Sequence, residues 1–139
     1  MADKNELIEK LNKALEWEYA AAVQYVQHAA VITGPEYDAI SAELVIHSNE
    51  EMAHAVTVSN VISDLGGTPS VDVEKREVSK DSKVMLEQDL AGEELAISMY
   101  KEIIAIAEQL GEYGIRRLME DILMQEEEHR RDLLSSLGK

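Results

Sequence analysis

Apolar residues recur along most of the chain at alternating spacings of three and four, which is the repeat of one face of an α-helix. Four long segments carry such a stripe, and none shows the strict alternation that is typical of a strand. In the second segment, for example, the stripe includes Leu44, Val58 and Leu65, and a Gly66-Gly67 pair follows it directly. The chain is therefore expected to be all-α.

Glycine and proline divide these segments at three places: Gly34-Pro35, Gly66 to Pro69, and Gly111 to Gly114. The first and third breaks are tight connections, so the helices on either side should be antiparallel, with the second helix beginning near Pro35. The charged stretch between Gly66 and about Asp81 is too short for a domain, and we interpret it as a crossover. The pattern predicts an antiparallel four-helix bundle with one long crossover between helices two and three.

The two helix pairs share an internal repeat with a constant offset in residue number. Several residues match at this offset: Glu18 and Glu93, Tyr25 and Tyr100, Leu44 and Met119, Glu51 and Glu126, and His54 and His129. Two copies of one hairpin would pack with pseudo-twofold symmetry. This symmetry would bring the polar residues of the two copies together.

Ionisable residues interrupt the apolar stripe of every helix, and two of the interruptions are Glu-x-x-His motifs. These are Glu51 with His54, and Glu126 with His129. A spacing of three residues places the carboxylate and the imidazole on one helix face, a turn apart. One such motif in an acidic helical protein is usually a solvated face. Two motifs on core stripes, at the repeat offset, favour a metal site.

The remaining helices each add one inward glutamate, and Glu93 is preferred over Glu94 because Glu94 falls on the outer face. The predicted ligands match the pattern of di-metal carboxylate bundles: Glu18, Glu51, His54, Glu93, Glu126 and His129. Two divalent cations would balance four buried carboxylates, which would otherwise be very costly in a core. Oxygen and nitrogen donors without sulfur suit iron or manganese, and zinc can compete. Spacing alone does not choose among these metals.

Three further residues lie on the stripes close to the predicted ligands. Tyr25 and Tyr100 can hydrogen-bond ligands or give electrons, and core packing with a satisfied hydroxyl is the alternative. His47 precedes the first Glu-x-x-His motif by one turn. It is either an extra ligand or station for incoming iron, or a core histidine hydrogen-bonded to a neighbour.

Composition narrows the function further. A chain of 139 residues with 45% hydrophobic residues is expected to form a single domain over residues 1–139. The net charge of −15 argues against nucleic acid and anionic membrane surfaces as partners. The absence of cysteine excludes thiolate metal sites and iron–sulfur clusters. With a polar N-terminus and no apolar run of spanning length, a cytoplasmic protein is expected.

These motifs together resemble the bacterioferritins, a family of the ferritin-like superfamily, over roughly residues 5–137. The matching segments are Leu11-Asn12-Lys13 leading to Glu18, Gln24-Tyr25, Glu51-Met52-x-His54-Ala55, Met85-Leu86, Asp89-Leu90-Ala91 with Glu93, Ile122-Leu123, and Glu126-Glu127-x-His129. In this family the two motif glutamates bridge two irons, the single glutamates are terminal ligands, and each histidine binds one iron. We therefore expect Tyr25, together with the six ligands, to be among the catalytic residues.

The resemblance implies a ferroxidase, which oxidises Fe(II) to Fe(III) with O2 or H2O2 for iron storage or detoxification. It also implies a homo-oligomer, either a dimer or a larger cage. A methionine at the position of Met52 binds haem in bacterioferritins, so haem is a possible cofactor, with packing or a dimer interface as the alternative role. The chain differs from the family after His129, where the fifth helix is missing, and at Ile46 and His47, where some members carry a histidine and an acid that pass iron inward.

Two other functions fit the same residues. A rubrerythrin-like peroxidase would use the same di-iron site to reduce peroxide and would store no iron. A non-catalytic bundle would use its inner charges to bind zinc or to pair with one another.

Overall fold

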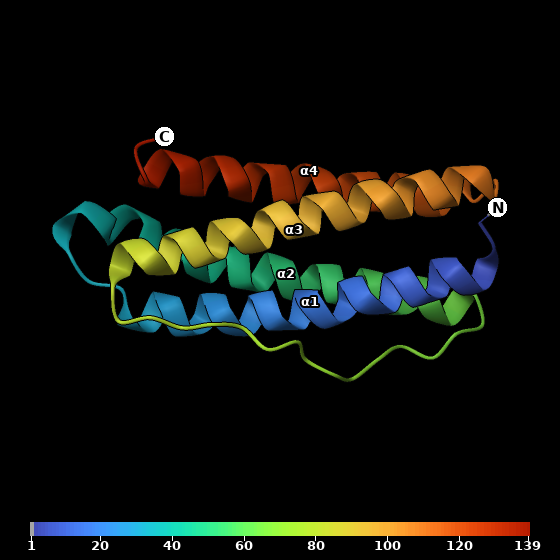
Figure 1. Ribbon diagram of the computed structural model, residues 1–139, viewed down its shortest axis with the longest axis horizontal. Helices are drawn as coiled ribbons and strands as arrows, with labels where there is room; N and C mark the ends of the chain where they lie inside the picture. Colours follow the sequence, from blue (N-terminus) through green and yellow to red (C-terminus); the bar gives the residue numbers. More distant parts are fainter. Residues whose placement is uncertain (1) are drawn as a thin grey trace.

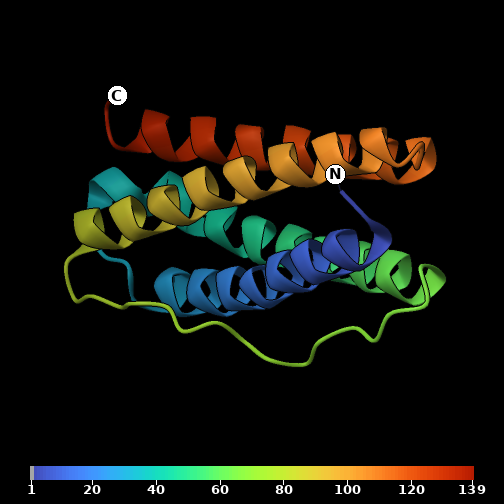
Figure 2. The same cartoon turned by 45° about the vertical axis from the view of Figure 1, so that its right-hand side comes forward.

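The computed structural model describes residues 2–139, which form four long α-helices that lie side by side (Figures 1 and 2). In chain order the helical elements are α1 (Lys4–Val31), the 3-10 turn η1 (Pro35–Tyr37), α2 (Asp38–Asp64), α3 (Ser82–Gln109) and α4 (Tyr113–Ser136). No strand occurs in this described part of the chain. The predicted all-α four-helix bundle is therefore confirmed.

Aspartate side chains cap two of the helices. The Asp3 carboxylate accepts a hydrogen bond from the Glu6 amide at 2.8 Å and starts α1, and Asp81 accepts from the Val84 amide at 3.0 Å and starts α3. At Pro35 the chain forms η1 first, so α2 begins at Asp38, slightly later than predicted. A 3-10 turn at this point tightens the connection before the α-helix begins.

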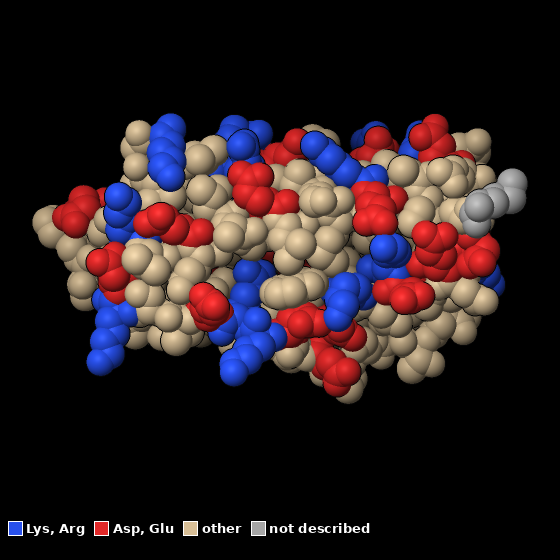
Figure 3. Space-filling view, in the orientation of Figure 1, with Lys and Arg blue, Asp and Glu red and all other residues tan. Residues whose placement is uncertain are grey.

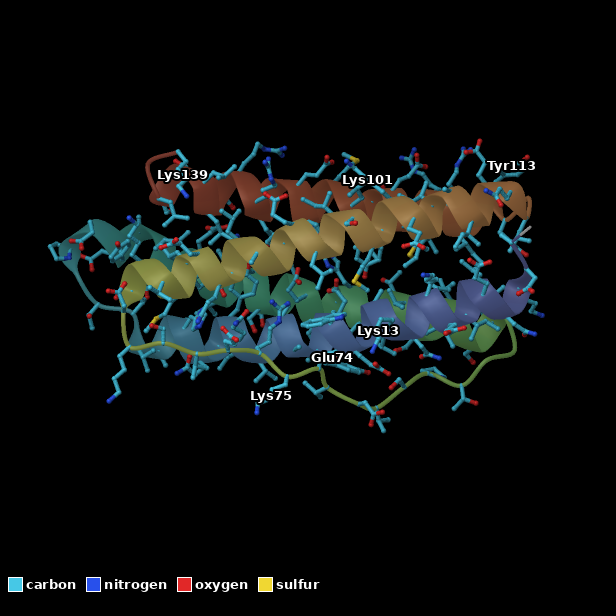
Figure 4. The ribbon with its side chains drawn as sticks, in the orientation of Figure 1. Lys13, Glu74, Lys75, Lys101, Tyr113 and Lys139 are labelled. Atoms are coloured by element: carbon cyan, nitrogen blue, oxygen red, sulfur yellow. The ribbon has the colours of Figure 1, made fainter. Side chains whose placement is uncertain are left out.

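The crossover runs outside the bundle along α1, from the end of α2 to the start of α3 (Figures 1 and 2). The Glu74 amide donates to the Glu16 carbonyl at 3.3 Å, and Gln24 Nε2 donates to the Glu77 carbonyl at 2.8 Å. Lys13 Nζ and Glu74 Oε1 are 2.6 Å apart and point toward one another in Figure 4. These contacts hold the crossover against α1, and α3 therefore runs parallel to α2 and antiparallel to α1.

The apolar core is divided into two clusters. The larger, at the end where α1 begins, includes Leu11, Val58 and Ile103, and the smaller, at the other end, consists of Tyr25, Ile40, Leu44, Leu86 and Leu133. Toward the ends of the long helices, the buried positions shift by one residue relative to the stripe that the sequence predicts. At the start of α1, for example, Leu7 is fully buried, whereas Ile8, which continues the spacing of Leu11 and Leu15, is only partly buried. A helix with 3.6 residues per turn drifts in this way against a strict repeat of three and four.

The surface carries interspersed charges. Acidic and basic side chains alternate over the face seen in Figure 3. Among the described residues, the helices are too polar or too short in their apolar runs to cross a membrane.

Candidate metal centre

A layer of buried ionisable side chains separates the two apolar clusters. Each of its six members, which are the predicted ligands, is at most 4% exposed: Glu18, Glu51, His54, Glu93, Glu126 and His129. All four helices contribute to this layer. The core stripe of each helix therefore turns its one or two charged positions toward the same point.

The six side chains form two groups that could each hold a metal ion. One group consists of Glu18, Glu51, His54 and Glu126, and the other of Glu51, Glu93, Glu126 and His129. Within each group, one ligand atom from every residue lies within 4.8 Å of the others. Glu51 and Glu126 belong to both groups, so these two carboxylates are placed to bridge two ions.

Each histidine faces the motif glutamate of the other hairpin. His54 Nδ1 lies 3.2 Å from Glu126 Oε1, and His129 Nδ1 lies 3.2 Å from Glu51 Oε1. These two contacts are related by the internal repeat. The predicted pseudo-twofold symmetry therefore extends to the side chains of the centre.

Several buried atoms of the centre have no hydrogen-bond partner. They include Glu51 Oε1, Glu93 Oε2, both carboxylate oxygens of Glu126, and His129 Nδ1. Burying such groups without partners is unfavourable, because water is removed and nothing replaces it. All of these atoms are good ligands for divalent metals of the first transition row. The residues present therefore fit two metal ions.

Burial and crowding change the proton affinities of these ligands. Burial, with the neighbouring Glu18 and Glu93, raises the pKa of Glu51 to about 8, and the pKa of Glu126 is also raised well above its ordinary value. Burial alone would lower the pKa of His129, but the Glu93 carboxylate, whose Oε1 lies 3.4 Å from His129 Nδ1, raises it to about 9. Without metal, the site thus retains protons near neutral pH, and these must leave when metal binds.

Two tyrosines hold the single glutamates. Tyr25 Oη donates to Glu93 Oε1 at 2.6 Å, and Tyr100 Oη donates to Glu18 Oε1 at 3.0 Å. Burial, together with the nearby carboxylates, raises the pKa of both hydroxyl groups well above the usual value. Both tyrosines therefore remain neutral hydrogen-bond donors that orient a ligand, so they do more than fill the core.

The outer nitrogen of each histidine also meets a polar side chain. His54 Nε2 lies 2.5 Å from Gln125 Oε1, and His129 Nε2 lies 3.3 Å from Glu50 Oε1. Glu50 and Gln125 were not singled out from the sequence. They are also related by the repeat offset, so this offset was the signal that would have found them.

Two other histidines lie outside the six-residue layer. His47 is completely buried, and its Nε2 lies 3.1 Å from Asp132 Oδ2, as the interpretation of a hydrogen-bonded core histidine requires. Burial and the neighbouring His129 lower its pKa. The ring of His28 contacts the buried Asp89 carboxylate at 2.8 Å, a pair that the sequence analysis did not identify.

The wall between α1 and α3 includes a side chain from the crossover. Arg76 lines a small cavity that also touches the ligands Glu18 and Glu51. Its guanidinium lies 5.1 Å from the Trp17 ring centroid and packs against Gly92, where a side chain would collide with it. The missing side chain of Gly92 therefore makes room for an arginine beside the centre.

Met52, the candidate haem ligand, lies on the outer face of α2. Its side chain is 45% exposed, whereas the adjacent Glu51 is buried in the centre. Met52 is therefore separated from the six-residue layer and belongs to the outer surface of the bundle.

Comparison with known proteins places this geometry in context. The family model for the ferritin-like domain matches residues 8–139 of this chain. A bacterioferritin of Brucella melitensis is 33% identical, over 100% of this chain and 91% of the relative. A protein of Nostoc named nutrient stress-induced DNA-binding protein is 32% identical, over 94% of this chain and 77% of the relative.

A crystal structure from Bacillus anthracis, described as that of ferritin-like, diiron-carboxylate proteins, has the same fold. Its TM-score is 0.93, with 28% sequence identity and coverage of 99% of both chains. The match therefore extends over the four helices and the crossover. The chain belongs to the ferritin family.

Proposed function

We propose that this protein is a di-iron ferroxidase that oxidises Fe(II) to Fe(III) with O2 or H2O2, for iron storage or detoxification. The observation that supports this is the pair of buried ligand groups that share Glu51 and Glu126. Two irons held this close supply two electrons at one place, as the reduction of H2O2 to water requires. Each Fe(II) gives one electron, and two protons complete the two waters.

The side chains of the centre have distinct roles in this proposal. Glu51 and Glu126 bridge the two sites, while His54 and His129 each hold one iron. The single glutamates are terminal ligands, and Tyr25 orients the one on α3 through its 2.6 Å hydrogen bond.

Proton transfer follows from the same groups. In the metal-free site, protons are retained by Glu51 and by His129, whose pKa values are raised to about 8 and about 9. Binding of Fe(II) displaces these protons. We expect the released protons to be measurable in weakly buffered solution.

Stopped-flow mixing tests the proposal. The metal-free protein is loaded anaerobically with two Fe(II) per chain and mixed with H2O2 or O2, and Fe(III) absorbance is followed. We expect the wild type to oxidise iron much faster than the variant Glu51→Ala/Glu126→Ala. A control, Glu120→Gln/Asp121→Asn, changes the same number of charges on the exposed face of α4. Equal rates for the wild type and the bridge variant would refute the proposal.

A second measurement separates storage from peroxidase chemistry. After aerobic loading with Fe(II) well above two per chain, a storage protein retains the excess iron in soluble form. A rubrerythrin-like peroxidase saturates near two irons per chain and, with a reductant, consumes many equivalents of H2O2. We expect retention of excess iron.

The outer face of α1 and α2 supports a homo-oligomer. Several large apolar side chains are more than 40% exposed there: Val23, Val26, Val45, Met52 and Val56. We propose that a second copy of the chain covers this face, because large apolar side chains exposed on two neighbouring helices favour association. Sedimentation of the variant Val26→Glu/Val56→Glu should then give a smaller particle.

Haem binding at Met52 would give an absorption band that Met52→Ala removes.

A further inference from the structure

Three basic side chains border the seam between α1 and α3, and two of them have carboxylate partners. Lys10 Nζ lies 2.9 Å from Glu102 Oε1, and Lys13 Nζ lies 2.6 Å from Glu74 Oε1. The third is Arg76, on the crossover. Among the described residues no carboxylate lies within ion-pair distance of its guanidinium, although the net charge of the chain is −15. An arginine without a partner is therefore unexpected here.

The surroundings of Arg76 leave its hydrogen-bond donors unsatisfied. The residue is only partly exposed, and its Nε is buried without a hydrogen-bond partner. The guanidinium lies 5.1 Å from the Trp17 ring centroid and occupies the space that a side chain at Gly92 would fill. Packing on an aromatic ring satisfies the flat face of a guanidinium, whereas the N–H donors lie at its edge. Packing alone therefore does not account for this arginine.

Arg76 also borders a pocket of about 330 Å³ between α1, α3 and the crossover. Trp17, Ala91 and Leu95 form an apolar wall of this pocket. Lys75, whose side chain extends from the crossover in Figure 4, adds a second positive charge at the rim. The pocket thus combines an unpaired cation with apolar surface, and its volume is typical of sites for small molecules.

The other polar residues of the pocket do not compete for the guanidinium. Gln24 Nε2 donates to the Glu77 carbonyl at 2.8 Å, so this amide is already used to hold the crossover. Glu77 itself is exposed, and solvent screens its charge. The side-chain oxygen of Gln88 is buried and has no hydrogen-bond partner. Because an amide can turn either its oxygen or its nitrogen inward, Gln88 can accept from or donate to a bound molecule.

We propose that this pocket binds a small organic carboxylate, with the carboxylate group on the edge of the Arg76 guanidinium and the carbon chain against Trp17 and Leu95. The planar fork of N–H donors matches the two oxygens of a carboxylate. The apolar wall favours an organic anion over a fully hydrated inorganic one such as phosphate, because the carbon chain loses contact with water on binding.

The pocket adjoins the metal centre but includes none of its six ligands. Arg76, Trp17 and Gly92 line both this pocket and the smaller cavity that touches Glu18 and Glu51. The guanidinium charge opposes the binding of cations at the centre, and a bound carboxylate neutralises this charge. A carboxylate and divalent metal ions should therefore bind more tightly together, each raising the affinity of the other by the same factor. The carboxylate site itself does not depend on the proposed ferroxidase function.

The fluorescence of Trp17 tests the proposal, because this residue is the only tryptophan in the chain and it lines the pocket. The metal-free protein is titrated with acetate, butyrate and inorganic phosphate at constant ionic strength. We expect a saturable change with butyrate, at least about threefold tighter binding of butyrate than of acetate, and weaker binding of phosphate. No saturable change with butyrate would overturn the proposal, and tighter binding of phosphate would overturn the assignment to a carboxylate.

Three variants show where the anion binds. Arg76→Gln removes the guanidinium and should weaken butyrate binding at least about tenfold. Gly92→Ala retains the charge but places a methyl group where the guanidinium lies, so it should weaken binding by a smaller factor. Arg117→Gln removes the same charge from the exposed face of α4 and should bind butyrate as the wild type does. Melting temperatures verify that each variant is folded, and unchanged affinity in both Arg76→Gln and Gly92→Ala would refute the site.

A second arm measures the coupling to the centre. With two Zn(II) bound per chain, the dissociation constant for butyrate should fall about fivefold relative to the metal-free protein. Zn(II) should have no such effect in Arg76→Gln. An equal constant with and without Zn(II) in the wild type would refute the coupling. The carboxylate site is judged by the first titration, and the ferroxidase function by the oxidation rate alone.

Discussion

The two ends of the bundle are built on matching positions of the internal repeat, yet their interiors differ. One end is filled by the larger apolar cluster, and the other combines the smaller cluster with two buried histidines and an aspartate. The difference lies in three pairs of buried positions, each related by the repeat offset: Ala14 and Asp89, Ile103 and His28, and Ile122 and His47. The apolar end shows that the fold can fill all three positions without polar groups.

Between these ends, the metal centre keeps the symmetry. The hydrogen bonds of Tyr25 to Glu93 and of Tyr100 to Glu18 are related by the repeat. Two ions in equivalent surroundings need equivalent ligands, whereas a route to them is needed from only one side. The comparison indicates that the apolar end contributes mainly stability and that the polar end gives up some stability for another purpose.

The largest expected effect comes from making the polar end resemble the apolar one. Asp89→Ala alone leaves His28 buried without its partner and should lower the free energy of unfolding by about 3 kcal/mol. Adding His28→Ile introduces the residue type found at the matching position and should recover most of this loss. Urea unfolding of the single and double variants measures both. A double variant as unstable as Asp89→Ala would show that the pair has a stabilising role that aliphatic packing cannot replace.

The pH dependence of thermal stability in the metal-free protein tests the layer of buried ionisable side chains between the two ends of the bundle. Folding raises the pKa of Glu51 from 4.5 to about 8 and that of His129 from 6.5 to about 9. The folded state therefore binds more protons than the unfolded state in these ranges, and stability decreases as the pH rises. Glu18, His54, Glu93 and Glu126 face the same two groups. We expect the melting temperature to fall between pH 6.5 and pH 9.

The matching series with Zn(II) bound provides the control. The metal displaces the same protons and neutralises the carboxylates, so the fall in melting temperature should be much smaller. A metal-free protein that becomes more stable over this range would contradict the expected proton uptake by the folded centre.

The smallest effect is expected where the centre departs slightly from symmetry. Glu50 contacts His129 Nε2, whereas Gln125 contacts His54 Nε2. Glu50→Gln should make the two metal positions more alike and change Zn(II) affinity by no more than about tenfold. Gln125→Glu should also make the two positions more alike, in this case by placing a carboxylate beside both histidines. Chelator competition resolves the two affinities, and a larger gap in Glu50→Gln than in the wild type would exclude this role.

Much of this organisation could be predicted from the sequence, because it depends on spacing along single helices. The Glu-x-x-His motifs and the stripes place Glu51 and Glu126 in the core without knowledge of any partner helix. Contacts between helices could not be predicted in this way. The pair of His28 and Asp89 joins α1 to α3, and its formation depends on how far the two helices are shifted and rotated against each other.

The contact between His47 and Asp132 could not be predicted for a related reason. Asp132 is an off-stripe acid in a chain with 28 acidic residues, so it does not stand out. Only His47 carried a signal, and its meaning depended on a residue 85 positions away. Arg76 was equally unremarkable in a charged crossover, since its position beside Gly92 follows from the path of the chain across α1.

That path also decides which arrangement of helices the chain can reach. The crossover connects Asp64, at the end of α2, to Ser82, at the start of α3, and it must pass along most of the length of α1. Fully extended, it reaches about 60 Å, while α1 is about 42 Å long. The crossover therefore has a reserve of about 18 Å, or roughly five residues, and its contacts with α1 take up part of it. Deleting more than about five residues would force α3 to start short of the far end, and its glutamate would then lie out of register with the ligands of the other three helices.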